Sequence, residues 1–283
     1  MTAAVPVPAR PRLLTLADRL HAWHGTAGPL TAAGLRHPAL SPEERARAAR
    51  FLRPEEAGWY AHSHAELRRL LARYLATAPA RLRFGRAPCP RCGDGPGGAH
   101  GRPRVTEPAT ALSFSLSRCG PDWLLAVAAD GRRVGADVER LRPLPAARLA
   151  AACLTDAERA WVTGPGAPDQ HGRSRRFLRC WTRKEAVVKA AGVGLATDLA
   201  RIETHAARPG PAVVALPGPG GGRFAVTDLA LAPGLVASVA VESPGGAREG
   251  DEGSESGEGD GQWGPGAQRG RPRRKDDPGG IHP

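Results

Sequence analysis

The feature of this sequence that most restricts its fold is a series of three short strands joined by tight turns. Residues 112–117 (LSFSLS) alternate strictly between apolar and serine side chains, which is the period of a strand with one buried face. Residues 123–129 (WLLAVAA) are apolar throughout, as expected for a strand inside a core. Asp130 and Gly131 then provide a two-residue hairpin turn, and residues 132–139 (RRVGADVE) return as a third strand. The pattern predicts an antiparallel sheet.

Helical patterns lie on both sides of these strands. Ser41 is predicted to cap one helix, and apolar residues recur at helical spacing in residues 65–75. Further along, Thr155 opens a capping box, and a long helix is predicted from about Ser174 to Ala191, ending before Gly192. Strand-like segments follow, at residues 211–216, 223–231 and 235–242. Because helices followed by strands occur twice, the predicted fold class is α+β, with two similar halves.

Composition divides the chain into four parts. Residues 1–36 are rich in Pro and Ala and are expected to be loosely ordered. Residues 37–129 and 130–243 are expected to form the N-terminal and C-terminal halves of the folded part. Residues 244–283 are rich in Gly, Pro and acidic residues and have few large apolar side chains, so we expect this tail to be disordered.

Charge favours a negatively charged partner. The formal net charge is +12, and the tail from Pro244 onward contributes eight acidic and six basic residues, so residues 1–243 carry +14. Such a surface suits a nucleic acid, a nucleotide-like cofactor or an acidic protein. No segment approaches 18 consecutive apolar residues, no secretory signal pattern is present, and five cysteines are an odd number. We therefore expect reduced thiols, a cytoplasmic location and no membrane partner.

Acidic side chains form the most informative pattern. Asp137 and Glu139 are two residues apart on the third predicted strand, so both carboxylates project from one face. Like charges repel at this spacing unless a cation lies between them, and a hard cation such as Mg²⁺ suits two carboxylates. On the long helix, Glu185 and Lys189 are four residues apart and are therefore neighbours on one face. Each motif alone also fits a solvated strand edge or a surface ion pair.

Together these motifs resemble the signature of a known family. Residues 134–139 (VGADVE), followed about 40 residues later by residues 181–195 (WTRKEAVVKAAGVGL), resemble the Sfp-type 4′-phosphopantetheinyl transferases. Residues 101–103 (GRP) and 114–120 (FSLSRCG) match two further elements of that family in the right order. Residues 51–75 resemble its N-terminal helical stretch. The likeness covers about residues 40–240.

The resemblance implies an architecture and a reaction. The two halves of the chain would be related by a pseudo-twofold axis, and each would be a small antiparallel sheet packed with helices. Coenzyme A and Mg²⁺ (Mn²⁺ as an alternative) would bind between the halves. The enzyme would move the 4′-phosphopantetheine of coenzyme A to a serine of an apo acyl or peptidyl carrier protein and release 3′,5′-ADP. The carrier would be an acidic helical protein, and the enzyme a monomer. The sequence does not say which carrier is served.

The resemblance also implies roles for particular residues. Asp137, Glu139 and Glu185 would be the metal ligands, with Glu185 also the general base. Lys189 would act in catalysis and contact the phosphates. The remaining coenzyme A ligands would be Arg102 at a phosphate, and Ser117 with Arg118 at the 3′-phosphate.

Four positions depart from the family pattern or have an open role. Arg118 and Cys119 stand where relatives usually have His and Ser, and His64 stands where they commonly have Arg. Lys184 would be a residue of the helix surface or one that steers phosphates.

A CxxC motif precedes the GRP element. Cys89, Cys92 and His100 provide three candidate zinc ligands, whereas a structural zinc site takes four. A loop with reduced thiols is the favoured interpretation.

Two other functions also fit an acidic cluster on a basic protein. The first is a metal-dependent nuclease, although such enzymes usually place their carboxylate and lysine two apart on a strand. The second is an Arg-rich nucleic-acid-binding module, for which an aromatic content of 5% provides few stacking platforms. The transferase reading involves no nucleic acid.

Overall fold

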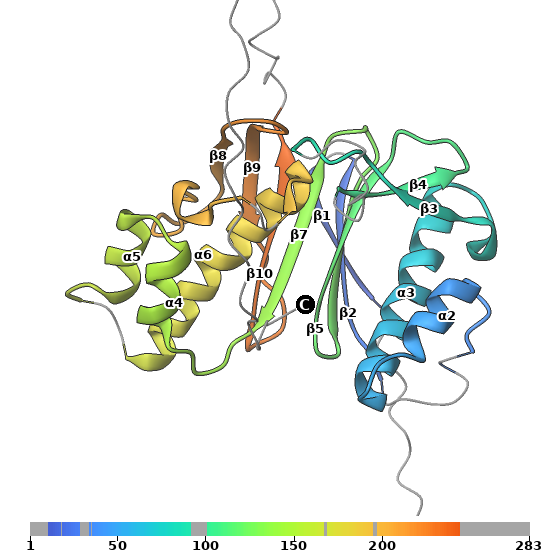
Figure 1. Ribbon diagram of the computed structural model, residues 1–283, viewed down its shortest axis with the longest axis horizontal. Coiled ribbons are helices and arrows are strands. Elements are labelled where there is room, and N and C mark those ends of the chain that lie inside the picture. The colour runs from blue at the N-terminus through green and yellow to red at the C-terminus, as the bar shows by residue number, and fades with distance from the viewer. Residues whose placement is uncertain are drawn as a thin grey trace, which may run out of the picture. The chain divides into compact units, whose positions relative to one another are not determined.

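Two four-stranded antiparallel sheets carry the fold (Figure 1). In the computed structural model, the described residues are 11–17, 19–28, 34, 36–91, 101–166, 169–194 and 197–243. The first sheet has the order β1-β2-β6-β5 and is formed by β1 (Arg12–Ala17), β2 (Leu20–Thr26), β5 (Ser113–Cys119) and β6 (Asp122–Ala128). The second has the order β7-β10-β9-β8 and is formed by β7 (Val134–Arg140), β8 (Ala212–Leu216), β9 (Gly222–Asp228) and β10 (Leu235–Glu242).

A smaller ribbon and five α-helices complete the described elements. The ribbon pairs β3 (Arg83–Arg86) with β4 (Pro103–Glu107). The helices are α2 (Pro42–Ala48), α3 (Pro54–Tyr74), α4 (Ala146–Cys153), α5 (Asp156–Thr163) and α6 (Gln170–Ala191). Short 3₁₀ turns lie at Pro79–Arg81 and Leu199–Arg201.

Local sequence signals explain several helix ends. Ser41 Oγ accepts a hydrogen bond from the Glu44 backbone N–H, and the Glu44 carboxylate accepts one from the Ser41 backbone N–H. This capping box starts α2. The Asp169 side chain caps α6, so this helix begins earlier than the predicted Ser174. Gly192 ends α6 in the left-handed conformation, with φ 75°, where an L-residue with a side chain is disfavoured.

The apolar core lies in layers. On α3, Leu67, Leu70 and Leu71 pack against one face of the first sheet, around Trp123 and Leu125. On the far side of the protein, α6 packs its apolar residues against Phe224 and Val226 of the second sheet.

The remaining faces of the two sheets share one core. Leu124 and Ala126 of β6 pack there with Val134, Ala136 and Val138 of β7. Strand alternation explains this arrangement, because successive side chains of β6 point to opposite faces. The layers therefore follow the order α3, first sheet, second sheet, α6 (Figure 1).

The edge strands β5 and β7 of the two sheets are joined by side chains. Backbone N–H groups along β7 donate to alternate side chains of β5: Ala136 N to Ser115 Oγ (3.1 Å), Val138 N to Ser117 Oγ (3.4 Å) and Arg140 N to Cys119 Sγ (3.3 Å). Ser113 Oγ donates to the Arg132 carbonyl at the end of the same row. We call these bonds, made by Ser113, Ser115, Ser117 and Cys119, the β5–β7 seam. The seam satisfies donors that an edge strand would otherwise leave unpaired.

The observed architecture confirms the α+β class with antiparallel sheets and helices. The strand orders β2-β6-β5 and β7-β10-β9 also correspond, because in each a strand is followed by helices and then by a hairpin whose second strand returns beside the first. The pseudo-twofold relation itself stays a prediction. The predicted boundary between halves, at residues 129–130, falls between β6 and β7. The predicted hairpin across this boundary is wrong: the chain leaves the first sheet after β6, and β7 pairs with β10 of the second sheet.

One expectation about the N-terminal segment is wrong. Residues 12–17 and 20–26, expected to be loosely ordered, form β1 and β2. The strand β2 is held by pairing with β6, for example Leu20 opposite Ala128, and local composition carries no information about a partner so distant in the sequence. The remainder of residues 1–36 is described only at 11, 19, 27, 28, 34 and 36, and the tail 244–283 lies outside the described residues.

None of the helices in the described ranges combines the length and the apolar character that crossing a bilayer would require.

Candidate active site

The candidate site lies where α6 crosses the face of β7. Gly135 permits this crossing, because a Cβ built there would lie 1.9 Å from the Ala186 carbonyl oxygen and 2.5 Å from the Ala190 nitrogen. With α6 so close, its polar residues face the acidic residues of β7. As predicted, Asp137 and Glu139 project toward this side while their apolar neighbours turn to the shared core.

Asp137 is the centre of the site and is only 4% exposed. Its Oδ1 atom lies 2.6 Å from Lys189 Nζ and accepts a hydrogen bond of 2.8 Å from Ser117 Oγ. Lys189 Nζ also donates to Ser117 Oγ at 3.3 Å. The other carboxylate oxygen, Oδ2, is buried and has no hydrogen-bond partner among the described residues.

Glu185 faces the same site from α6. Its side chain is 8% exposed, and its buried Oε1 atom has no hydrogen-bond partner in the described part of the chain. Burial raises the pKa of Glu185 to about 7; the ammonium of Lys189 opposes this rise, and the charges of Asp137 and Glu139 add to it. These mutual effects place the three carboxylates within electrostatic range of one another.

Glu139 lies at the more exposed side of the site. Its Oε2 atom is 3.2 Å from Arg142 Nη1 and 3.6 Å from Cys119 Sγ. Burial, followed by the charge of Asp137, raises the pKa of Glu139, and Arg142 opposes this effect.

Lys189 provides the positive charge of the site. Burial alone would lower the pKa of Lys189, but the carboxylates of Asp137 and Glu185 outweigh it and hold that pKa above its ordinary value. The ammonium group is therefore charged at neutral pH and compensates part of the acidic cluster.

The carboxylate oxygens of Asp137, Glu139 and Glu185 suit a hard cation chemically, but their arrangement fits a metal site only in part. In the described ranges, no group of three or more His, Cys, Asp or Glu side chains is arranged so that it could hold a metal ion. Two buried carboxylate oxygens, Asp137 Oδ2 and Glu185 Oε1, nevertheless have no donor among the residues that the structure describes, and carboxylate oxygens are the ligands that Mg²⁺ prefers. The three-carboxylate metal site stays a prediction.

The predicted coenzyme A ligands do not all lie together. Ser117 faces β7, whereas the guanidinium of Arg118 lies on the other side of β5, 5.1 Å from the centre of the Tyr60 ring. Arg102 lies against Gly192 at the end of α6, since a Cβ built on Gly192 would be 2.9 Å from Arg102 Cγ. Burial, together with the charge of Arg133, lowers the pKa of Arg102, and Glu242 opposes this.

The position where relatives commonly have Arg is occupied by a histidine in an acidic contact. His64 Nδ1 lies 3.2 Å from Glu44 Oε1, and its ring stacks on Tyr60 with centroids 4.1 Å apart. Arg68, one turn further along α3, donates from Nε to Glu44 Oε2 at 2.6 Å. The nearby arginine on the same helix thus pairs with the carboxylate that His64 also contacts.

Comparison with known proteins adds to this geometry. Residues 133–232 match the family described as ACPS: 4′-phosphopantetheinyl transferase superfamily. The 4′-phosphopantetheinyl transferase HetI of Nostoc sp. is 30% identical over 193 residues, which are 67% of this chain and 76% of that protein. The chain belongs to the 4′-phosphopantetheinyl transferase superfamily.

Further relatives cover shorter parts of this superfamily member. The 4′-phosphopantetheinyl transferase AcpT of Escherichia coli O157:H7 is 41% identical over 96 residues, which are 34% of this chain and 47% of that protein. A phosphopantetheinyl transferase of Thraustochytrium sp. is 26% identical over 177 residues, or 57% of this chain and 56% of that one. The enzyme class expected from the motifs is confirmed, and assignment to the Sfp type stays a prediction.

The structure corrects the expectation for Lys184 of this transferase. Its side chain is not on the helix surface but is fully buried, 2.7 Å from Glu158 Oε2, and it donates to the carbonyl oxygens of Leu199 (2.8 Å) and Ile202. Adjacent helical residues differ by about 100° in direction, so Lys184 and Glu185 face different neighbours. A phosphate has no access to this ammonium group.

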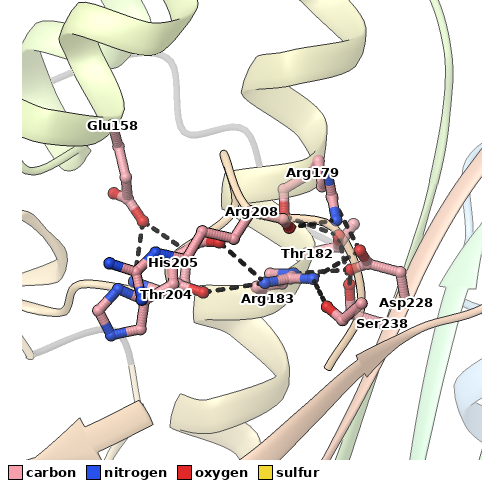
Figure 2. Close-up of polar contacts among 10 residues, drawn as sticks. Glu158, Arg179, Thr182, Arg183, Thr204, His205, Arg208, Asp228 and Ser238 are labelled. Atoms are coloured by element: carbon pink, nitrogen blue, oxygen red, sulfur yellow. Dashed lines mark hydrogen bonds and ion pairs between the residues drawn. The ribbon is translucent and has the colours of Figure 1, made fainter. Parts of the chain in front are cut away.

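A second buried charge on α6 was missed by sequence reasoning. Arg183 is completely buried, and its guanidinium pairs with Asp228 at 2.7–2.8 Å and donates to the carbonyl oxygens of Thr204 and Gly210 (Figure 2). Arg179 also pairs with Asp228, at 2.7 Å. Because arginine is so common in this sequence, no local signal distinguished Arg183 from the exposed arginines.

The candidate zinc ligands lie at the limit of what is described. Cys89 is 3% exposed, whereas Cys92 and His100 lie outside the described residues. The zinc hypothesis is therefore untested.

Proposed function

We propose that this chain transfers 4′-phosphopantetheine from coenzyme A to a serine hydroxyl of an apo acyl or peptidyl carrier protein and releases 3′,5′-ADP. The observation that carries the proposal is the pair of buried carboxylates Asp137 and Glu185 beside Lys189, with two carboxylate oxygens that have no donor in the described part of the chain. Membership of the transferase superfamily supports the same reaction.

The carboxylates are proposed to hold one divalent cation, Mg²⁺ with Mn²⁺ as an alternative. Asp137 Oδ2 and Glu185 Oε1 would be its inner ligands, with Glu139 at the exposed side. When bound, the cation neutralises charge on the diphosphate as the carrier serine attacks the β-phosphate.

Two side chains of α6 would act on the reacting groups. Lys189 is charged and lies beside the carboxylates, so it is placed to contact a phosphate oxygen of the diphosphate. Glu185 is the proposed acceptor for the proton of the carrier serine, directly or through a water molecule. Arg102, which precedes β4 and lies against Gly192 at the end of α6, would contact another phosphate oxygen.

The 3′-phosphate of coenzyme A is proposed to bind near Tyr60. Arg118 and Arg47 both place their guanidinium groups near this ring, at 5.1 Å and 5.6 Å from its centre. In the described part of the chain, neither guanidinium pairs with a carboxylate. Two such arginines on one side of β5 provide the charge that a phosphomonoester requires. This assigns the 3′-phosphate to Arg118 without a contribution from Ser117.

Glu185 and Lys189 lie on a helix, which is unlike the strand spacing expected for the nuclease alternative. The positive charge of residues 1–243 suits an acidic helical carrier.

Intact-protein mass spectrometry tests the proposal. A panel of apo acyl and peptidyl carriers is incubated with the full chain, coenzyme A and Mg²⁺, with serine-to-alanine carriers as controls. We expect at least one carrier to gain the mass of phosphopantetheine, and its alanine control to gain none. Absence of a mass gain with every carrier would contradict the proposed function, and a salt-dependent mobility shift of DNA would favour the nucleic-acid alternative.

A further inference from the structure

The β5–β7 seam contains one serine whose bonding differs from that of its neighbours. Ser115 Oγ accepts a hydrogen bond from the Ala136 N–H of β7 and has no other side-chain bond in the described part of the chain. Ser117 Oγ accepts from the Val138 backbone N–H at 3.4 Å and also donates to Asp137 Oδ1 at 2.8 Å. Ser117 thus connects the seam directly to the central carboxylate of the candidate site.

The hydrogen-bonding capacity of Ser117 is fully used. A hydroxyl group has one proton to donate and two lone pairs that accept. Its lone pairs face the Val138 N–H and Lys189 Nζ, which lies 3.3 Å away, and its proton goes to Asp137. A phosphate oxygen needs a donor, so Ser117 would have to release Asp137 in order to bind one.

The place of Ser117 in the strand leads to the same conclusion. Side chains of adjacent strand residues point to opposite faces, and Arg118 lies at Tyr60 on the face away from β7. Ser117 itself is only 6% exposed. A single phosphate held by Arg118 is therefore on the other side of β5 from the Ser117 hydroxyl.

The two partners of Asp137 Oδ1 determine what its second oxygen can do. Ser117 and Lys189 both contact Oδ1, so the carboxylate is fixed with Oδ2 buried and without a partner among the described residues. Groups that bond to a metal ligand in this way set its orientation and commonly change metal affinity when they are removed.

We propose that Ser117 is a positioning residue that orients Asp137 so that Oδ2 faces the divalent-cation site, and that it does not bind the 3′-phosphate. This inference rests on the cation site of the proposed function. It differs from the role that the family resemblance implies for this serine.

The test compares Ser117→Ala with Ser115→Ala as a matched control. Both variants lose a hydroxyl on the same face of β5 and one seam bond to a backbone N–H, but only the first loses a bond to a carboxylate. The affinity for Mn²⁺ is measured on the full chain by isothermal titration and by electron paramagnetic resonance, with and without coenzyme A. Thermal unfolding of each variant reports the loss of the seam bond itself.

We expect Ser117→Ala to weaken Mn²⁺ binding about tenfold or more, the range seen when a group that supports a metal ligand is removed. Ser115→Ala is expected to change Mn²⁺ affinity less than about twofold, although both variants lower the unfolding temperature by similar amounts. Ser117→Thr keeps the hydroxyl and is expected to restore most of the affinity; it also serves if the alanine variant fails to fold.

A second measurement separates this role from phosphate binding. The ratio of KM for 3′-dephospho-coenzyme A to KM for coenzyme A should be unchanged in Ser117→Ala and should fall toward one in Arg118→Ala. A ratio that falls in Ser117→Ala with unchanged Mn²⁺ affinity would overturn the inference, and so would a wild-type chain that binds no Mn²⁺. Because Mn²⁺ binding is measured without a carrier, an absence of transfer to any carrier would count against the proposed function alone.

Discussion

At the scale of single residues, Asp137 combines two tasks that the sequence showed only in part. Its Oδ1 atom is engaged by Lys189 and Ser117, and its Oδ2 atom has no donor in the described part of the chain. The spacing of Asp137 and Glu139 indicated a shared face, and that face is observed. The contact with Ser117 could not be predicted, because it depends on how two sheet edges meet.

Asp137→Asn tests the charge of this residue without changing its shape. The amide can still accept from Ser117 but no longer offers a negative charge to a cation or to Lys189. We expect transfer to fall about a hundredfold or more, the usual cost of removing an electrostatic group from a reacting site. The mass-spectrometric assay measures this loss, and circular dichroism checks the fold.

The control for this variant is Asp130→Asn, in the turn between β6 and β7 and paired with Arg132 away from the site. It should retain activity within about twofold, as surface substitutions usually do. Full activity of Asp137→Asn at limiting Mg²⁺ would contradict the assignment of Asp137.

Asp228 shows how the charge of a partly buried carboxylate depends on its partners. Burial alone would raise the pKa of Asp228, but the hydrogen bonds and charges of Arg183 and Arg179 hold it below its ordinary value (Figure 2). A carboxylate with a depressed folded-state pKa adds stability above its unfolded pKa, and this contribution is lost as the pH falls through the folded value. The contribution is therefore present at neutral pH and disappears in acid.

Asp228→Asn is accordingly expected to lower the free energy of unfolding by about 3 kcal/mol near pH 7, because it leaves the buried Arg183 without a counter-charge. The difference from wild type should shrink as the pH falls below about 4. Urea denaturation at several pH values measures this. Glu56→Gln, which breaks an exposed pair with Arg53, should cost less than about 1 kcal/mol at pH 7. A difference for Asp228→Asn that does not vary with pH would contradict the argument.

At the scale of elements, local patterns predicted the parts that form local contacts. Alternation and turn residues were sufficient to predict the strands β5, β6 and β7, and β5 pairs with its neighbour β6. The predicted hairpin at Asp130-Gly131 was wrong, because β7 pairs with β10 in the second sheet, and β10 is about a hundred residues away. The strands β1 and β2 were missed because β2 pairs with β6, whose residues are about a hundred positions away.

The burial of α6 shows a second limit of sequence patterns. Its middle turns, from Thr182 to Val188, are buried on every side, so this part of the helix has no exposed face. An amphipathic pattern, which places charged residues on an exposed face, therefore could not predict that Arg183 and Lys184 are buried. Their partners, Asp228 and Glu158, come from distant segments. Sequence spacing placed Glu185 and Lys189 on one helix face but could not identify the charges that hold the helix.

Gly135→Ala tests the contact between α6 and β7. The added Cβ would lie 1.9 Å from the Ala186 carbonyl oxygen, so helix and strand must separate. We expect a loss of about 2 kcal/mol or more in unfolding free energy, as in overpacked cores, together with a large loss of transfer because Lys189 moves away from Asp137. Chemical denaturation and the mass assay measure the two effects.

Gly234→Ala is the comparison for the glycine variant, because no atom lies within 4 Å of its Cβ position and its only difficulty is a φ of 82°. It should cost about 1 kcal/mol and leave transfer intact. Equal losses of transfer in both variants would contradict a specific role of the α6–β7 contact.

At the scale of the whole molecule, charge is expected to govern encounters with the carrier. Residues 1–243 carry +14, whereas an acidic carrier carries the opposite sign. We expect KM for the carrier to rise about fivefold or more when NaCl is increased from about 50 mM to about 500 mM, because salt screens exposed charges. Steady-state kinetics measures this. A carrier with neutralised acidic helix residues should show a weaker dependence, and a KM that does not change with salt would contradict electrostatic docking.

The way the two sheets are joined has a consequence for how the distance between them can change during evolution. In a continuous β-sheet, main-chain hydrogen bonds fix the distance between neighbouring strands. Every residue type has the same main chain, so this distance does not depend on the side chains. Here the spacing between β5 and β7 depends on the length and polarity of the side chains at 113, 115, 117 and 119. Point substitutions at those four positions are therefore enough to widen or narrow the gap beside the acidic cluster, without any rearrangement of either half.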